Sequence, residues 1–167
     1  MPRAPISYTS ADKAITLDSA WKLNHVGIPL QDLDKTVANF KLLGASLGRE
    51  FIIDSSKFAE YLVYGKTPDP VVQTRGMFAQ IGPLRMELLQ PVQGHTVHKE
   101  FLERSGEGIG HIAYTVDDLE GETMKLVEKG FTVILSIIPQ GQKERSAVYI
   151  DTRNKFSNLI IELIQTR

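Results

Sequence analysis

His-Val-Gly-Ile-Pro-Leu-Gln-Asp-Leu-Asp at residues 25–34 and His-Ile-Ala-Tyr-Thr-Val-Asp-Asp-Leu-Glu at residues 111–120 are two versions of one segment, and they align without a gap. The same offset brings Gly44 onto Gly130, and each copy closes with a related segment, residues 86–90 and 161–165. Internal similarity of this kind indicates that one supersecondary unit occurs twice. We therefore predict two copies of a single folding unit within the 167 residues of this chain.

Each copy has the local pattern of a strand, a helix and further strands. Residues 23–30 and 109–116 are short, apolar and partly β-branched, which is typical of strands. Asp32 and Asp118 follow as helix-start signals, because a short carboxylate accepts hydrogen bonds from free backbone N–H groups. Gly44 and Gly130 stand where a left-handed helix end belongs. Further strands are expected at 46–53, 59–64, 73–81 and 85–90 in the first copy, and at 132–138, 144–150 and 159–164 in the second.

This order of elements predicts an α+β fold made of tandem βαβββ modules, and it divides the chain into four parts. Residues 1–20 show no firm pattern and are expected to form an N-terminal arm. Residues 21–94 form the first module, residues 95–106 a connector helix, and residues 107–167 the second module.

Composition narrows the class of protein. The formal net charge is −1 and no long run of like charge occurs, so we expect neither nucleic acid nor an anionic membrane as a partner. No stretch approaches the roughly 20 apolar residues of a membrane span, and the first twenty residues lack the apolar run of a secretory signal. The chain has no cysteine, so a metal site must use nitrogen and oxygen ligands. We expect a cytoplasmic protein.

Four polar residues at matched places in the two copies predict a metal site. Glu87 and Glu162 each lie inside an apolar strand, where a lone carboxylate costs several kcal/mol unless it is paired, protonated or bound to metal. His25 and His111 open the first strand of each copy. A pseudo-twofold arrangement brings these four side chains to one point, and two imidazoles with two carboxylates suit one divalent ion such as Zn, Co, Ni, Mn or Fe.

Other polar residues are interpreted more simply. Taken singly, a histidine in a strand is more often a hydrogen-bonded core residue, and a strand glutamate often faces solvent; the matched placement is what favours ligation. His95 and His98 flank the connector helix without a counterpart in the repeat, so we expect both at the surface. Arg75 and Gln80 have three open interpretations: facing the cleft, facing solvent, or bonding across strands.

Residues 21–166 resemble the vicinal oxygen chelate superfamily, which includes glyoxalase I, methylmalonyl-CoA epimerase, extradiol dioxygenases and fosfomycin-resistance enzymes. The resemblance rests on the opening segment 24–28 and the closing segment 159–163. Residues 86–91 and the connector 101–113 are most similar to the methylmalonyl-CoA epimerase branch. The resemblance implies an open, curved mixed sheet around a metal-binding cleft, and a homodimer.

The resemblance also implies a reaction, proton abstraction next to a carbonyl of an acyl-CoA or another small carbonyl compound. The chain departs from the epimerase branch in two places: Gly110 precedes His111 where His-His is common, and residues 74–80 lack the acid that some epimerases use as a base. The catalytic carboxylates would then be Glu87 and Glu162 themselves, as in glyoxalase I. A glyoxalase I-type lactoylglutathione lyase, an Fe(II) dioxygenase and a non-catalytic binding protein are the alternatives.

Overall fold

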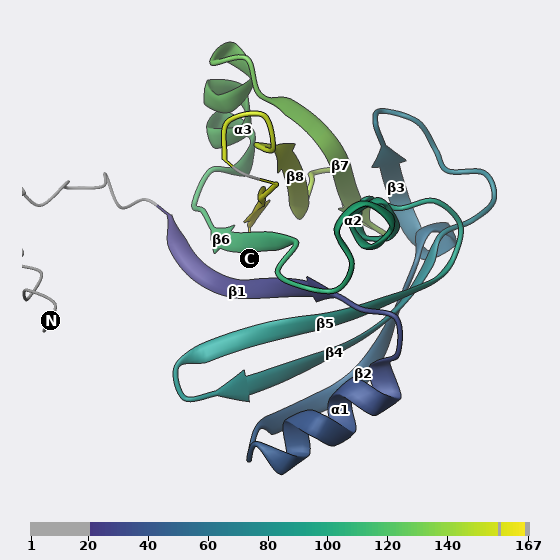
Figure 1. Ribbon diagram of the computed structural model, residues 1–167. Coiled ribbons are helices and arrows are strands. Elements are labelled where there is room, and N and C mark those ends of the chain that lie inside the picture. Colours follow the sequence, from purple (N-terminus) through teal and green to yellow (C-terminus); the bar gives the residue numbers. More distant parts are fainter. Residues whose placement is uncertain (1–20, 157, 166–167) are drawn as a thin grey trace, which may run out of the picture.

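The computed structural model describes residues 21–156 and 158–165, which form one nine-stranded sheet and three α-helices (Figure 1). The first part of the chain contains β1 (Lys22–Pro29), α1 (Leu33–Leu42), β2 (Ser46–Asp54), a 3-10 turn (Ser55–Lys57), β3 (Phe58–Val63), β4 (Gln73–Ile81) and β5 (Leu84–Gln93). The second part contains α2 (Val97–Ser105), β6 (His111–Thr115), α3 (Leu119–Glu128), β7 (Thr132–Pro139), β8 (Ala147–Asp151) and β9 (Ile160–Ile164).

The strand order shows the duplication directly. It runs β2-β4-β5-β1-β6-β9-β8-β7-β3, and β1 and β6 pair antiparallel at the centre. On either side of this pair, the opening strand of one copy lies parallel to the closing strand of the same copy, β1 with β5 and β6 with β9. The predicted α+β fold of tandem modules in an open, curled mixed sheet is confirmed (Figure 1).

Strand β3 is placed differently from the sequence-based expectation. The sequence predicts residues 59–64 as a strand of the first module, but β3 pairs with β7 at the far edge of the second half, with Tyr61 opposite Ile137 and Val63 opposite Leu135. The reason is that β2 and β4 pair with each other, which leaves the segment between them to cross over. Tyr61 and Val63 become buried on the second half of the sheet. The module boundaries themselves remain a prediction.

Local signals place the first helix of each copy as expected. Asp32 accepts a hydrogen bond from the Lys35 backbone N–H at 2.9 Å, and Asp118 accepts one from the Gly121 N–H at the same distance. These carboxylates satisfy a backbone donor that the first helical turn leaves free. Gly44 and Gly130 take φ values of 76° and 82°, which favour glycine over residues with a Cβ.

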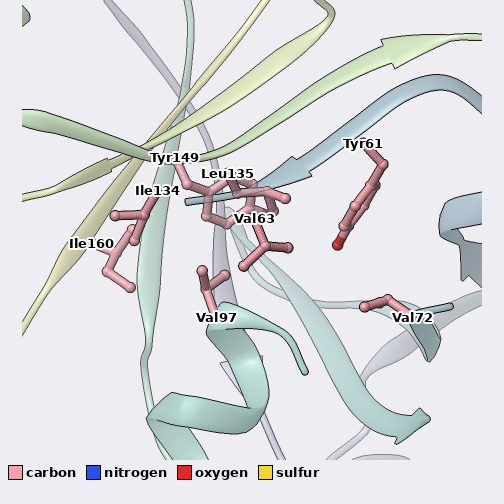
Figure 2. Packing of buried hydrophobic residues seen from close by; sticks show 8 residues of the cluster. All are labelled: Tyr61, Val63, Val72, Val97, Ile134, Leu135, Tyr149 and Ile160. Carbon is pink, nitrogen blue, oxygen red and sulfur yellow. The ribbon is translucent and has the colours of Figure 1, made fainter. Parts of the chain in front are cut away.

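Helices cover the two faces of the sheet unequally. On the outer face, α1 buries Leu33 against Leu88 of the first half, and α3 buries Leu119 against Leu163 of the second half. The opposite, inner face receives α2, whose Val97 packs on the second half while the helix also lies near β1 and β5 (Figure 1). Figure 2 shows its Val97 among apolar side chains of the second half and of β3; the cluster contains Tyr61, Val63, Val72, Val97, Ile134, Leu135, Tyr149 and Ile160.

Candidate metal centre

Strand register sets one row of side chains across the inner face. Residues paired on neighbouring strands share a face of the sheet. Glu87 on β5 lies opposite Phe78 on β4 and beside Gly27 on β1, and Gly27 in turn lies opposite His111 on β6. The row therefore reads Phe78, Glu87, Gly27, His111. It brings a carboxylate from one copy next to the imidazole of the other.

A second row repeats the first with the two copies exchanged. Glu162 on β9 lies opposite Tyr149 on β8 and beside Ala113 on β6, and Ala113 lies opposite His25 on β1. The row reads Tyr149, Glu162, Ala113, His25. The two rows cross at the β1–β6 pair, so a pseudo-twofold relation brings two histidines and two glutamates to one point.

Gly27 provides space for the His111 ring. A Cβ built on Gly27 would lie 1.7 Å from Cε1 of His111 and 2.2 Å from each ring nitrogen, far inside any tolerated contact. The backbone of β1 therefore forms the surface on which this imidazole rests. Ala113, the counterpart of Gly27, is also small and faces His25. A histidine with a small residue two places later is thus a structural requirement of this crossing.

The donor atoms converge closely. His25 Nε2 lies 3.2 Å from Glu87 Oε2 and 3.3 Å from Glu162 Oε2. His111 Nε2 lies 3.6 Å and 3.3 Å from the same two oxygens, and the two Nε2 atoms are 3.4 Å apart. One donor from each of the four residues lies within 4.8 Å of every other. The structure thus brings together all four side chains that the sequence singles out.

These separations fit a divalent ion. Four donors about 2.1 Å from one ion in a tetrahedral arrangement are about 3.4 Å from one another. All four residues are buried, with relative exposures between 1% and 8%, and Glu162 Oε2 accepts no hydrogen bond from outside the cluster among the described residues. A buried carboxylate oxygen of this kind needs positive charge beside it, from a protonated imidazole or from a cation. The cluster therefore suits a metal ion.

The electrostatics point the same way. Burial lowers the pKa of His111, but hydrogen bonding and charge from Glu162 and Glu87 outweigh burial and raise that pKa to about 9. The pKa of His25 is raised in the same manner against the effect of burial. Burial acts to raise the pKa values of Glu87 and Glu162, but the histidines lower both. The two ionised carboxylates therefore stabilise the protonated, positively charged form of the two imidazoles.

Asn24 orients His25 from the side away from the cluster. The Asn24 Oδ1 lies 2.8 Å from Nδ1 of His25, and the Asn24 amide donates to Oγ1 of Thr115 at 2.9 Å. A proton on Nδ1 then bonds to Asn24, so that Nε2, which lies on the side of the two carboxylates, is the nitrogen that would ligate an ion in place of its proton. This is the arrangement expected of a metal-ligating histidine.

His98 is buried, so the expectation that it lies at the surface is wrong. Its relative exposure is 4%, and its ring lies 5.6 Å from that of His111 and 5.5 Å from that of Tyr149. The reason is that α2 packs on the inner face, so that His98, next to Val97, points toward His111 and Tyr149. Burial and then the charge of His111 lower the pKa of His98 to about 4, so it is neutral at pH 7. His95 is exposed, as expected.

Tyr149 is a residue of this site that sequence reasoning missed. It is buried opposite Glu162, and its ring lies 5.0 Å from that of His111. Burial, followed by the charge of Glu162, raises the pKa of Tyr149 well above 10, so its hydroxyl stays protonated. Its counterpart in the first copy is Phe78, which packs edge-on against His25. The two glutamates therefore face different neighbours.

Arg75 and Gln80 do not contribute to the cluster. Arg75 donates to Asp34 and Glu50, which ties β4 to α1 and β2. Gln80 is exposed and donates to the carbonyl of Gly82. Of the three interpretations open for these residues, Arg75 therefore takes the cross-strand one.

Gly110 has a packing role of its own. A Cβ at this position would lie 2.9 Å from Cδ and Cγ of Pro29 and 3.4 Å from the Phe101 ring. Because the proline ring cannot move away readily, the chain has no room for a second histidine before His111.

The fold and site define a two-copy protein with a buried His₂Glu₂ cluster, and the chain belongs to the Glyoxalase/Bleomycin resistance protein/Dioxygenase superfamily, whose pattern matches residues 24–149. The resemblance drawn from the sequence is thereby confirmed.

Particular relatives are methylmalonyl-CoA epimerases. The chain is 25% identical to the human mitochondrial methylmalonyl-CoA epimerase, over 99% of this chain and 87% of the relative. It is 28% identical to the ethylmalonyl-CoA/methylmalonyl-CoA epimerase of Cereibacter sphaeroides, over 86% of this chain and 97% of the relative. The crystal structure of methylmalonyl-CoA epimerase from Mycobacterium tuberculosis superposes with a TM-score of 0.62 at 22% identity, covering 87% of this chain and 88% of that one. These relatives support an enzyme of this superfamily that acts on a small molecule.

Within residues 21–156 and 158–165, none of the helices has the length and apolar character needed to cross a membrane.

Proposed function

We propose that this protein is a divalent-metal-dependent isomerase that moves the proton next to a carbonyl, as a methylmalonyl-CoA epimerase does. The observation that carries the proposal is the crossing of the two rows, which sets one buried carboxylate on each side of a pair of imidazoles. The epimerase relatives, similar over most of their length, support the choice of reaction.

His25, Glu87, His111 and Glu162 would hold the ion, with Zn, Co, Ni, Mn and Fe as the candidates. A bound divalent ion supplies Lewis acidity, which lowers the energy of negative charge on the carbonyl oxygen. The residues of the chain do the rest: Asn24 keeps His25 oriented, and the buried walls keep water from the carbonyl.

One of the two glutamates takes the proton from the carbon next to the carbonyl. Because inversion at that carbon requires a proton to return from the opposite face, the second glutamate would enter the cycle protonated and supply that proton across the pseudo-twofold axis, after which proton exchange with solvent restores both groups. We assign these roles to Glu87 and Glu162 because residues 74–80 contain no acid.

The test follows the proton. The metal-loaded protein is incubated in deuterium oxide with one epimer of methylmalonyl-CoA, and α-proton exchange and racemisation are followed by NMR. Glu87→Gln and Glu162→Gln should each lower the rate by about 10²- to 10⁴-fold. Glu128→Gln, at an exposed position of α3, is the matched control and should exchange at the unsubstituted rate. Full exchange in both site variants would eliminate the assignment.

Metal removal separates the ion from the glutamates. Exchange should stop after treatment with a chelator and return when Co²⁺ or Zn²⁺ is added.

The absence of a mid-strand acid also favours a second candidate, a glyoxalase I-type reaction that uses a ligand glutamate as its base. Formation of lactoylglutathione from methylglyoxal and glutathione would identify that reaction.

A further inference from the structure

The two halves of the inner face differ in how they are covered. On the second half, α2 buries Val97, His98 and Phe101. Its Glu100 fixes the helix from outside, accepting hydrogen bonds from Tyr64 at 2.5 Å and lying 2.7 Å from Nε2 of His95. The approach to the His₂Glu₂ cluster from this side is therefore closed.

On the first half of the inner face, α2 approaches β1 and β5 but has no comparable contact with β2 and β4 within the described residues, and α1 packs on the outer face. Phe51 and Phe78 lie there with ring centroids 5.5 Å apart, and the Phe51 ring covers Gly76. Both rings are half-buried, and Phe78 contacts His25. This aromatic surface therefore borders the cluster on the side of β4.

Arg85 stands at the rim of this open half. It precedes Glu87 by two residues on β5, so both side chains belong to the inner face. Its guanidinium carbon lies 3.8 Å from the centre of the Phe78 ring, and Nη1 donates to Oδ1 of Asn24 at 3.4 Å. Stacking on the ring holds the guanidinium flat and partly preorganised.

Arg85 has no carboxylate partner inside the described part of the chain. Other arginines that lie near carboxylates are paired with them: Arg75 with Glu50, Arg145 with Glu120 and Arg153 with Asp151. No Asp or Glu oxygen among the described residues lies within ion-pair distance of Arg85, and its side chain is exposed. Its remaining N–H groups are free to bind an anion bidentately.

The neighbouring space can take such a group. Phe78 and Arg85 border a cavity of about 210 Å³, whose other walls come from residues 46–48 of β2 and from Ala79 and Gln80. A carboxylate or a phosphate is small enough to enter it, and Phe78 connects it to His25, whose ring centroid lies 5.5 Å from that of Phe78.

From this geometry we infer that Arg85 is a specificity-determining residue, which binds an anionic group of the substrate on the open half of the cleft. The anion is a carboxylate on the acyl part or a phosphate on its carrier. The inference rests on the proposed function, because it assumes that a carbonyl compound occupies the cluster.

The test compares four thioesters that differ in where charge lies: malonyl-CoA, acetyl-CoA, the malonyl thioester of N-acetylcysteamine, and its neutral acetyl counterpart. Calorimetry measures their binding to the metal-loaded protein, to Arg85→Gln, to Arg85→Lys and to the control Lys41→Gln on α1. Arg85→Gln should weaken binding of those probes whose anionic group Arg85 contacts by about 10-fold or more, and Arg85→Lys should weaken it by less. Lys41→Gln should bind as the unsubstituted protein does.

The pattern identifies the anion. If Arg85→Gln loses affinity for both malonyl probes but not for acetyl-CoA, Arg85 binds the acyl carboxylate. If it loses affinity for the two CoA thioesters and for neither of the other probes, Arg85 binds the carrier phosphates. Three results for Arg85→Gln would overturn the inference. Its affinity for the neutral acetyl probe could fall as much as its affinity for the charged ones, its binding of all four probes could be unchanged, or its Zn²⁺ affinity could fall by a matching factor. If the unsubstituted protein binds none of the probes, the proposed function fails together with it.

Discussion

Substitution of Gly27 by alanine tests whether His111 must lie where the register puts it. The new Cβ would be 1.7 Å from Cε1 of His111, whereas ordinary non-bonded carbon contacts are about 3.5 Å. The ring or the β1 backbone must therefore move by roughly 2 Å. A metal–donor distance tolerates about 0.2 Å, so Nε2 of His111 would leave the donor set.

We expect Gly27→Ala to lower Zn²⁺ or Co²⁺ affinity by more than the roughly 10- to 100-fold that loss of an outer hydrogen-bond partner costs. Overpacking should also reduce the free energy of unfolding of the metal-free protein by about 1–3 kcal/mol. Calorimetric metal titration and urea denaturation measure the two effects.

Two further variants make the test decisive. Gly48→Ala is the matched control, because the nearest atoms to a Cβ there are the carbonyl oxygen of Phe78 at 3.4 Å and its Cβ at 3.6 Å, which are ordinary contacts. Gly27→Ala combined with His111→Ala removes the obstructing ring, and should recover stability without recovering metal affinity. If Gly27→Ala binds metal as tightly as Gly48→Ala does, the described position of His111 is not the metal-binding one.

Two other predictions concern protons and the neighbours of the glutamates. The pKa of His111 is about 9 in the fold against 6.5 in the unfolded chain. Protonated His111 therefore adds on the order of 3 kcal/mol to the free energy of unfolding of the metal-free protein below pH 6.5, and this stabilisation is lost as the pH rises through 9. The melting temperature of the metal-free protein should fall as the pH rises from 6.5 to 9, while its Zn²⁺ affinity should rise over the same range. A melting temperature that stays constant or increases with pH in the absence of metal would contradict this. Tyr149→Phe removes a buried hydroxyl beside Glu162 and should cost about 1–3 kcal/mol in urea unfolding. Tyr114→Phe, at a half-buried tyrosine of β6, should cost less, and equal midpoints would show that Tyr149 gives Glu162 no support.

The cluster could be predicted from sequence because its residues violate the local pattern. Glu87 and Glu162 interrupt apolar strands, and the alignment of the two copies connects them to His25 and His111. Helix starts at Asp32 and Asp118 depend on hydrogen bonds within a few residues, so short-range reasoning reaches them.

What could not be predicted depends on contacts between distant segments. The partner of β3 is β7, and nothing in residues 59–64 alone distinguishes that edge from the adjacent strands of its own copy. His98 is buried only because α2 lies on the inner face rather than outside it. Tyr149 is an ordinary aromatic residue of an apolar strand until the register sets it opposite Glu162. Its counterpart Phe78 was not recognised either, since the loops before the closing strands differ in length.

The register makes the two rows equivalent at the donors, whereas their surroundings make the two glutamates unequal. Glu162 faces a protonated tyrosine hydroxyl that supports its charge, and Glu87 faces the Phe78 ring, which offers no donor. The aromatic surface of Phe51 and Phe78 also lies on the side of Glu87. A carboxylate takes a proton more readily where no hydrogen-bond donor stabilises its charge and where substrate arrives. In the proposed reaction we therefore expect Glu87 rather than Glu162 to take the first proton, and a duplicated fold can in this way give two identical residue types different tasks.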